Sequence, residues 1–216
     1  MEVWLVLLVG LLFIIFFGGL AMVRKEPLPI RFVFECLGLT ALAYLVYWAT
    51  RYLVSPVVFL LILYIVTMRA QILTDAGTFL ASRGNFGMAE RFYSIAQRIG
   101  MGDSAKCVAQ INIGTCYLKQ GRFKESLEVL RAVAELADKG LVGPKHEAAC
   151  RYNLGLALMR SGHTAEAVHQ LSEVEELLPA SMYGVGARAE LKRYRKAATS
   201  ADGEVEATPE PDEEKS

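Results

Sequence analysis

One spacing of small and large residues occurs three times in the second half of the sequence. An apolar residue followed by Gly is followed by a second Gly seven residues later, by Ala or Ser five residues after that, and by an aromatic residue or Leu four further on. The copies are Ala76-Gly77, Gly84, Ala89 and Tyr93; Ile113-Gly114, Gly121, Ser126 and Leu130; and Leu154-Gly155, Gly162, Ala167 and Leu171. Small residues fit where two helices cross, and large residues fill the space where helices interlock. The spacing predicts an all-α solenoid of about three stacked helical hairpins.

The first half of the sequence contains three long apolar segments. Val3 to Val23 has 21 uncharged residues, enough for an α-helix to cross a bilayer core. It exceeds the ~7–15 apolar residues of a signal peptide, and the Met1-Glu2 head carries no basic side chain, so we expect an uncleaved membrane anchor. Further spans are expected at about 32–50 and 52–68.

Two details refine these segments. Glu35 interrupts the second one four residues after Arg31, and we expect the two side chains to pair at the headgroup level. Ser55-Pro56 reads as a helix N-cap followed by Pro at the first helical position, so the third helix is expected to begin late and to be short. From Pro56 to about Ser82 we predict one continuous helix into the first hairpin, the alternative being a kink near Thr74-Asp75.

The basic residues predict an orientation. Arg24, Lys25 and Arg31 crowd the first loop, which the positive-inside tendency places in the cytoplasm. Three spans then put the N-terminus outside and everything after Arg69 in the cytoplasm, in a plasma (inner) membrane. If the third segment lies in the interface instead, the repeat domain is on the outer side.

Charge divides the chain into three expected domains. Residues 1–68 form the membrane anchor, and residues 69–199, with 18 basic and 13 acidic side chains, form the repeat domain. Residues 200–216 carry seven acids and are expected to be disordered, because they lack apolar residues to offset the entropy of ordering. Ser181 to Ala198 is expected to be a capping helix, whose basic run at 192–196 either contacts anionic lipid or is solvated.

The segment 105–137 resembles a tetratricopeptide repeat (TPR). The residues that carry this resemblance are Ile113, Gly114, Tyr117, Gly121, Phe123, Ser126, Leu130 and Val133, and the other two copies repeat most of the pattern. The turn glycines are 37 and 41 residues apart, where the family period is about 34. Extra residues are therefore expected around 100–103 and 139–144. The resemblance implies helix-turn-helix repeats whose first helices line a concave groove.

Carried over residue by residue, the resemblance predicts a partner-binding groove. Its expected lining residues are Thr74, Thr78, Val108, Ile111, Thr115, Lys119, Tyr152, Leu156 and Arg160, with Gln71, Ser82 and Ala149 on the same faces. Tyr152 either contacts the partner or packs on the segment 139–144. Lys119 and Arg160 are the groove's cations, and a weakly basic, partly apolar groove suits a helix or extended peptide that bears a few acids.

Catalytic chemistry is not expected. His146, His163 and His169 have neither metal-ligand spacing nor a partnered nucleophile, and the chain has no glycine-rich phosphate loop or GxSxG motif. The four cysteines form no CxxC pair and are expected to be buried thiols. We expect no enzyme activity, no cofactor, no metal and no nucleic acid.

Two functions remain open from the sequence. The first is a membrane-tethered adaptor or scaffold that recruits a protein or peptide partner at the lipid bilayer. The second is a structural subunit or assembly factor of a membrane complex, in which the anchor makes the main contacts.

Overall fold

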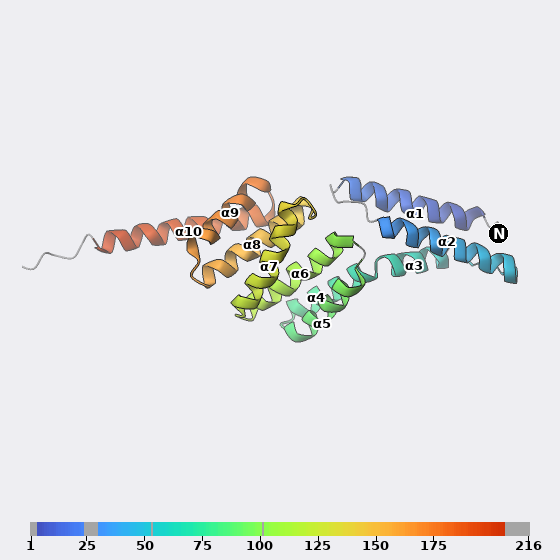
Figure 1. Cartoon of the computed structure of the whole chain (residues 1–216), viewed down its shortest axis with the longest axis horizontal. Coiled ribbons are helices and arrows are strands. Elements are labelled where there is room, and N and C mark those ends of the chain that lie inside the picture. The colour runs from blue at the N-terminus through green and yellow to red at the C-terminus, as the bar shows by residue number, and fades with distance from the viewer. Residues whose placement is uncertain (1–3, 24–29, 53, 101, 206–216) are drawn as a thin grey trace, which may run out of the picture.

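All secondary structure in the described residues is helical. The structure is a computed structural model that describes residues 4–23, 30–52, 54–100 and 102–205 (Figure 1). Its helices are α1 (Trp4–Val23), α2 (Ile30–Thr50), α3 (Pro56–Thr67), α4 (Arg69–Ser82), α5 (Phe86–Ile99), α6 (Gly102–Lys119), α7 (Phe123–Asp138), α8 (Pro144–Arg160), α9 (Thr164–Leu177) and α10 (Met182–Val205). Figure 1 shows an elongated molecule, with α1–α3 side by side at one end and α10 at the other.

Helices α4–α9 form the three predicted hairpins. Gly84, Gly121 and Gly162 lie in the turns at φ of +78°, +75° and +82°, a region that residues with a Cβ rarely adopt. This common geometry reverses the chain in the same way three times. The extra residues expected around 139–144 lie in the connection from α7 to α8, whereas those expected around 100–103 fall partly in α6, which already begins at Gly102.

A glycine in the first helix of each hairpin faces a large residue in the second. An added Cβ would lie 2.7 Å from Tyr93 Cε1 at Gly77, 2.6 Å from Leu130 Cγ at Gly114, and 2.8 Å from Leu171 Cγ at Gly155. Each glycine thus lets its two helices approach closely. The predicted register of small and large residues is confirmed in all three copies.

The apolar core of the solenoid is built where successive hairpins meet. Ala89 and Tyr93 of α5 pack with Cys116 of α6, and Leu130 of α7 packs in one cluster with Leu154 of α8. At the end of the stack, α10 buries two apolar residues, Ala187 and Leu191, against α8 and α9. The predicted capping helix is therefore present, and it covers an apolar face that would otherwise meet water.

Helices α1–α3 form a bundle with a separate small core. Phe13, Phe32 and Leu63 are buried in it, and α1 crosses α2 closely at Gly10, where an added Cβ would lie 3.3 Å from Thr40 Cβ. Among the described residues, α2 alone is long and apolar enough to cross a bilayer, and α3 with α4 adds a second candidate only when the bent pair is taken as one span. The apolar stretch Trp4–Leu20 of α1 is slightly shorter than a full membrane span requires.

Helix α3 is short, as its first residues predicted. Ser55 precedes it and Pro56 is its first residue. Its 12 residues cover about 18 Å, less than the ~30 Å hydrocarbon core of a bilayer. The expected third span at 52–68 is therefore not filled by α3 alone.

The prediction of one continuous helix from Pro56 to Ser82 is wrong. The chain bends by 67° between α3 and α4, and Met68 at the bend has φ −96° and ψ 10°. The expected alternative, a kink near Thr74-Asp75, is also absent, because α4 is continuous through both residues. Side chains bind the carbonyl groups at the end of α3: Thr67 Oγ1 donates to the Leu63 oxygen at 2.6 Å, and Arg69 Nη1 donates to the Val66 oxygen.

Glu35 of α2 pairs with Arg69, the first residue of α4 after the bend. Its carboxylate accepts two hydrogen bonds from the Arg69 guanidinium, at 2.7 and 2.8 Å. The expected pair of Glu35 with Arg31 is therefore corrected to Glu35 with Arg69. The hydrogen bonds that Arg69 donates to Glu35 raise the pKa of Arg69 above its ordinary value, so this cation stays charged. A planar, bidentate pair fixes orientation as well as distance.

Helix α10 is longer than predicted. It continues to Val205, so residues 200–205 are helical although disorder was expected from residue 200. A helix that is already nucleated extends at little further cost, which local composition alone does not register. Residues 206–216 lie outside the described residues. The basic run 192–196 lies on α10 at the end of the molecule opposite the bundle (Figure 1), which disfavours its contact with the lipids around α1–α3.

All four cysteines are buried and free, as expected. Burial raises the pKa of Cys107 and Cys116, and raises that of Cys150 to about 12. The Cys150 thiol donates to the Leu130 oxygen at 3.3 Å. These thiols fill small spaces between helices and are protected from reagents in water.

Candidate partner-binding face of the repeats

The predicted groove residues occupy equivalent positions on α4, α6 and α8, counted from the packing glycines Gly77, Gly114 and Gly155. We name three of these sets the inner, middle and outer rows. The inner row is Thr74, Ile111 and Tyr152; the middle row is Thr78, Thr115 and Leu156; and the outer row is Ser82, Lys119 and Arg160. A fourth set, lying before the inner row, is Gln71, Val108 and Ala149.

The inner row packs inside the solenoid. Thr74 and Ile111 are only 6% and 5% exposed, and Ile111 shares a core cluster with Ala149 of the next first helix. Tyr152 is half-buried beneath α10: its ring lies 5.8 Å from the ring of Tyr183 and closes on Gly186, where an added Cβ would meet it at 3.0 Å. Within the chain, Tyr152 therefore packs on α10 and not on the segment 139–144.

The middle and outer rows leave an accessible face. Thr115 and Leu156 are half-buried, and Thr78 is exposed, although its hydroxyl accepts a hydrogen bond from Tyr93 at 3.1 Å. Val108, from the fourth set, is also half-buried. The floor of this face is thus made of hydroxyl and aliphatic groups, which fit a partner without a strong charge.

Two cations stand at the rim of this face. Lys119 and Arg160 are exposed in the last turns of α6 and α8, and neither makes an ion pair with another described residue. Part of their role is local, because a cation favours the negative end of the helix dipole. Their exposed charges also suit acidic groups on a partner.

Arg151 is the centre of a polar cluster that the sequence did not predict. This side chain is 10% exposed and binds Glu147 at 2.9 Å, Glu173 at 2.7 Å, and also Asp138. Burial by itself lowers the pKa of Arg151, but the hydrogen bonds to Glu147 and Asp138, together with the negative charges of Glu173 and Glu147, outweigh burial and raise the pKa. The cluster joins the end of α7 to α8 and α9. Only the Glu147–Arg151 spacing of four residues was visible as a local signal.

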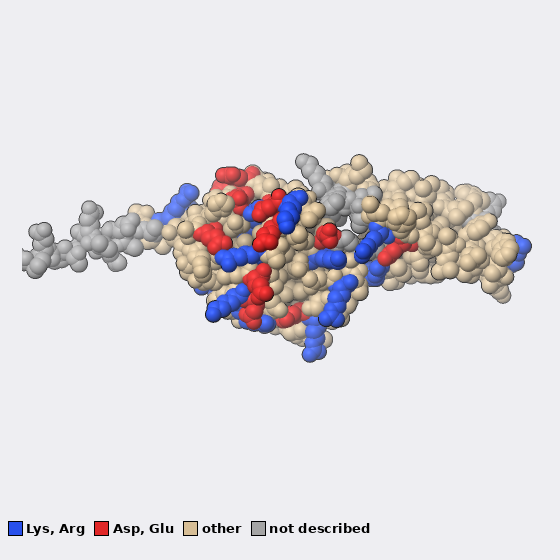
Figure 2. All heavy atoms as spheres, in the orientation of Figure 1, with Lys and Arg blue, Asp and Glu red and all other residues tan. Residues whose placement is uncertain are grey.

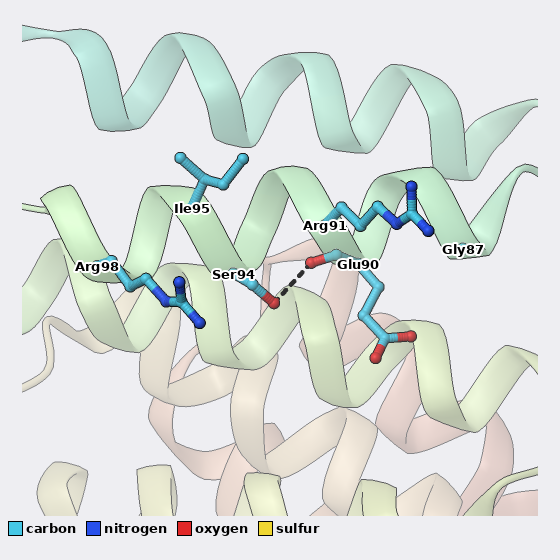
Figure 3. A pocket seen from close by; sticks show the side chains of 6 residues that line it. All are labelled: Gly87, Glu90, Arg91, Ser94, Ile95 and Arg98. Carbon is cyan, nitrogen blue, oxygen red and sulfur yellow. Dashed lines mark hydrogen bonds between the residues drawn. The ribbon is translucent and has the colours of Figure 1, made fainter.

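A shallow hollow of about 500 Å³ lies over the outer face of α5. Its described lining residues are Gly87, Glu90, Arg91, Ser94, Ile95 and Arg98 (Figure 3). The Glu90 carboxylate accepts hydrogen bonds from Tyr117 at 2.9 Å and Arg122 at 3.4 Å, so its charge is compensated by the second repeat. Arg91 and Arg98 form no ion pair with any described residue.

No group of three or more His, Cys, Asp or Glu within the described ranges is arranged to hold a metal ion. The comparison with curated proteins returned no match. A family model described as "Tetratricopeptide repeat" matches residues 105–180, the interval of the second and third hairpins. The first hairpin lies outside this match but shares the same glycine packing. The match supports the tetratricopeptide repeat superfamily for this all-α solenoid, and such repeats suggest a scaffold for interactions between proteins.

Proposed function

We propose that this chain is a non-enzymatic scaffold that is tethered to a membrane by α1–α3 and recruits a protein or peptide partner through its repeats. The observation that carries the proposal is the contrast between two surfaces of one chain. Most of the exposed large apolar side chains belong to α1–α3. In Figure 2 the charged side chains gather over the solenoid, whereas the bundle end is almost free of them.

The bundle surface supports tethering. Leu11, Phe16, Phe34 and Trp48 are each more than half exposed and point away from the small core. Such a surface is unfavourable in water and favourable in hydrocarbon. Although α3 is short, the 21 residues of α2 are enough to span, and the 20-residue α1 contains the somewhat shorter apolar stretch Trp4–Leu20.

Charge placement supports a cytoplasmic repeat domain. The Glu35–Arg69 pair joins the first part of α2 to the start of the solenoid, so Arg31, near the beginning of α2, lies with Arg69 at the repeat end of the bundle. Arg51 lies at the opposite end of α2. An excess of basic residues at the repeat end favours the cytoplasm for that end.

The accessible face suits a helix or extended peptide with a few acidic groups. Its middle row supplies hydroxyl and aliphatic contacts, and Lys119 and Arg160 supply charge at the rim. Tethering adds to such a weak interaction, because confinement beside the membrane raises the effective concentration of a membrane-associated partner.

A second function has its own observation. An apolar hollow of about 590 Å³ lies between α1 and α3. Its lining residues are Val9, Leu12, Phe13, Phe16, Phe17, Val57, Leu60, Leu61 and Tyr64. An apolar helix of another subunit would fit this surface, as expected for a structural subunit or assembly factor of a membrane complex.

The orientation is tested by thiol labelling in sealed right-side-out vesicles. Tyr52→Cys, in the connection between α2 and α3, should react with a membrane-impermeant maleimide. Lys139→Cys, after α7, should react only after detergent is added. The native thiols give a low background because all four are buried. Labelling of Lys139→Cys in intact vesicles would place the repeats outside.

The binding face is tested by photo-crosslinking of the full chain in its native membrane. A benzoylphenylalanine at Leu156 should capture a partner, and the double charge reversal Lys119→Glu with Arg160→Glu should strongly reduce that adduct. The matched control, Lys124→Glu with Lys139→Glu, changes exposed lysines elsewhere and should leave the adduct unchanged. An adduct formed only from a photo-crosslinker at Phe16 would favour the second function.

A further inference from the structure

The first helix of the solenoid carries an apolar stripe that its counterparts lack. Five residues before and two residues after the packing glycine, α6 has Ala109 and Cys116, and α8 has Cys150 and Ala157. All four are small and nearly fully buried. The same positions of α4 hold Ile72 and Phe79, which are 41% and 55% exposed.

The difference follows from what covers each helix. The second helix of the preceding hairpin packs on both of these helices. Cys116 of α6 shares an apolar cluster with residues of α5, and the Cys150 thiol of α8 donates a hydrogen bond to the Leu130 oxygen of α7. No hairpin precedes α4 among the described residues. A surface left to water would favour polar residues here, yet the chain has two of its larger apolar side chains.

The stripe ends in a cation. The Arg83 guanidinium lies 4.2 Å from the centre of the Phe79 ring. Ile72, Ala76, Phe79 and Arg83 follow the spacing of one helix face. An apolar face with an arginine at its end is typical of a helix that lies in a membrane interface.

The bend between α3 and α4 lays α4 along the bilayer surface when α3 follows the membrane normal. The 14 residues of α4 cover about 21 Å. A bend of 67° leaves only about 8 Å of that length along the axis of α3. In Figure 1 α4 follows α3 directly as the first helix of the solenoid, so no earlier solenoid helix covers the side of α4 that α5 and α6 leave open.

The charge on the outer faces of the second helices also distinguishes the first hairpin from the other two. Three positions on the outer face of α5 hold Arg91, Ile95 and Arg98 (Figure 3). The equivalent residues are Glu128, Ala132 and Glu135 on α7, and His169, Glu173 and Glu176 on α9. The hairpin next to the bundle is thus basic where the following two are largely acidic, which suits anionic lipid headgroups.

We infer that α4 is seated in the lipid interface, with Ile72 and Phe79 inserted at the boundary between headgroups and acyl chains. Arg83 contacts lipid phosphates from the end of the stripe, and the arginines of α5 add attraction to anionic lipid. This inference rests on the proposed membrane anchoring. With the Glu35–Arg69 pair, it gives the solenoid a second attachment and holds the accessible face at a fixed angle to the membrane.

The test is site-directed spin labelling of the full chain in nanodiscs of phosphatidylcholine and phosphatidylglycerol. Labels are attached singly to Ile72→Cys, Phe79→Cys, Thr78→Cys and Leu42→Cys, and the native buried thiols stay unlabelled. The measured quantity is accessibility to oxygen, which concentrates in lipid, relative to a water-soluble nickel chelate. Thr78 is the matched control because it is exposed and neighbours Phe79 on a different face of α4.

Positions 72 and 79 are expected to show a ratio several-fold above that of position 78 and below that of position 42. A ratio at both positions equal to that of position 78 overturns the inference while leaving the anchoring intact. Low accessibility to both reagents also overturns it, because another part of the protein then covers the stripe. A water-like ratio at position 42 would instead show that the anchoring proposal has failed, and the inference with it.

Discussion

Replacement of Gly114 by leucine is expected to lower the stability of the solenoid by about 3 kcal/mol or more, the upper end of the usual cost of overpacking. Even a single Cβ at this position would lie 2.6 Å from Cγ and 2.8 Å from Cδ2 of Leu130. Leu130 is completely buried, so it has no free space to occupy. The leucine must therefore force α6 and α7 apart.

The measurement is a thermal melt of the full chain in detergent, followed by circular dichroism at 222 nm. A loss of this size corresponds to a fall in Tm of about 10 °C for a domain of this length. Gly114→Ala should lose less, because the end of the Leu130 side chain can move and alanine favours the helix.

Gly87→Leu is the matched control. Gly87 is also helical, in α5, but an added Cβ there meets nothing within 4 Å. This variant should melt at the wild-type temperature or slightly above it. If Gly114→Leu melted with wild type as well, the packing register of the hairpins would be wrong.

Replacement of Arg151 by alanine is expected to cost about 2–3 kcal/mol, somewhat below the 3–5 kcal/mol typical when one partner of a fully buried ion pair is removed. The guanidinium is nearly buried, and its loss leaves the carboxylates of Asp138, Glu147 and Glu173 close together without a cation. Water reaches Asp138, which is 60% exposed, and this reduces the cost.

The same melt measures this effect, with Arg131→Ala as the control. Arg131 binds Glu166 at 2.7 Å, but both side chains are more than 40% exposed, so its removal should cost less than about 1 kcal/mol. Arg151→Lys should recover only part of the loss, because an ammonium group cannot bind several carboxylates in the fixed geometry of a guanidinium. Equal melting of the Arg151→Ala and Arg131→Ala variants would contradict a stabilising role for the cluster.

The hairpins were predictable because their packing is local. Gly114 and Leu130 belong to one hairpin, and the small and large residues that define the crossing recur with the same spacing in all three copies. The turn glycines were predictable for a similar reason, since each is required by the backbone of its own turn. The match of residues 105–180 to the repeat family reflects this local regularity.

The candidate binding face was predictable only in part. Helical spacing identified the face of each first helix, but it does not indicate how closely the next first helix approaches. The inner row therefore included Thr74 and Ile111, which are buried, and Tyr152, which lies beneath α10. The exposure of Lys119 and Arg160 followed from their place at the ends of helices.

The sequence by itself determined the helical hairpins, their register, the turn geometry and the division into an apolar bundle and a charged solenoid, because each depends on residues close together in the chain. Only the tertiary structure decided the bend at Met68, the partner of Glu35 and the cluster around Arg151. Glu35 and Arg69 are 34 residues apart, and their pairing depends on how α2 packs beside α3. Contacts of this kind arise from the packing of whole helices, which no local spacing of residues specifies.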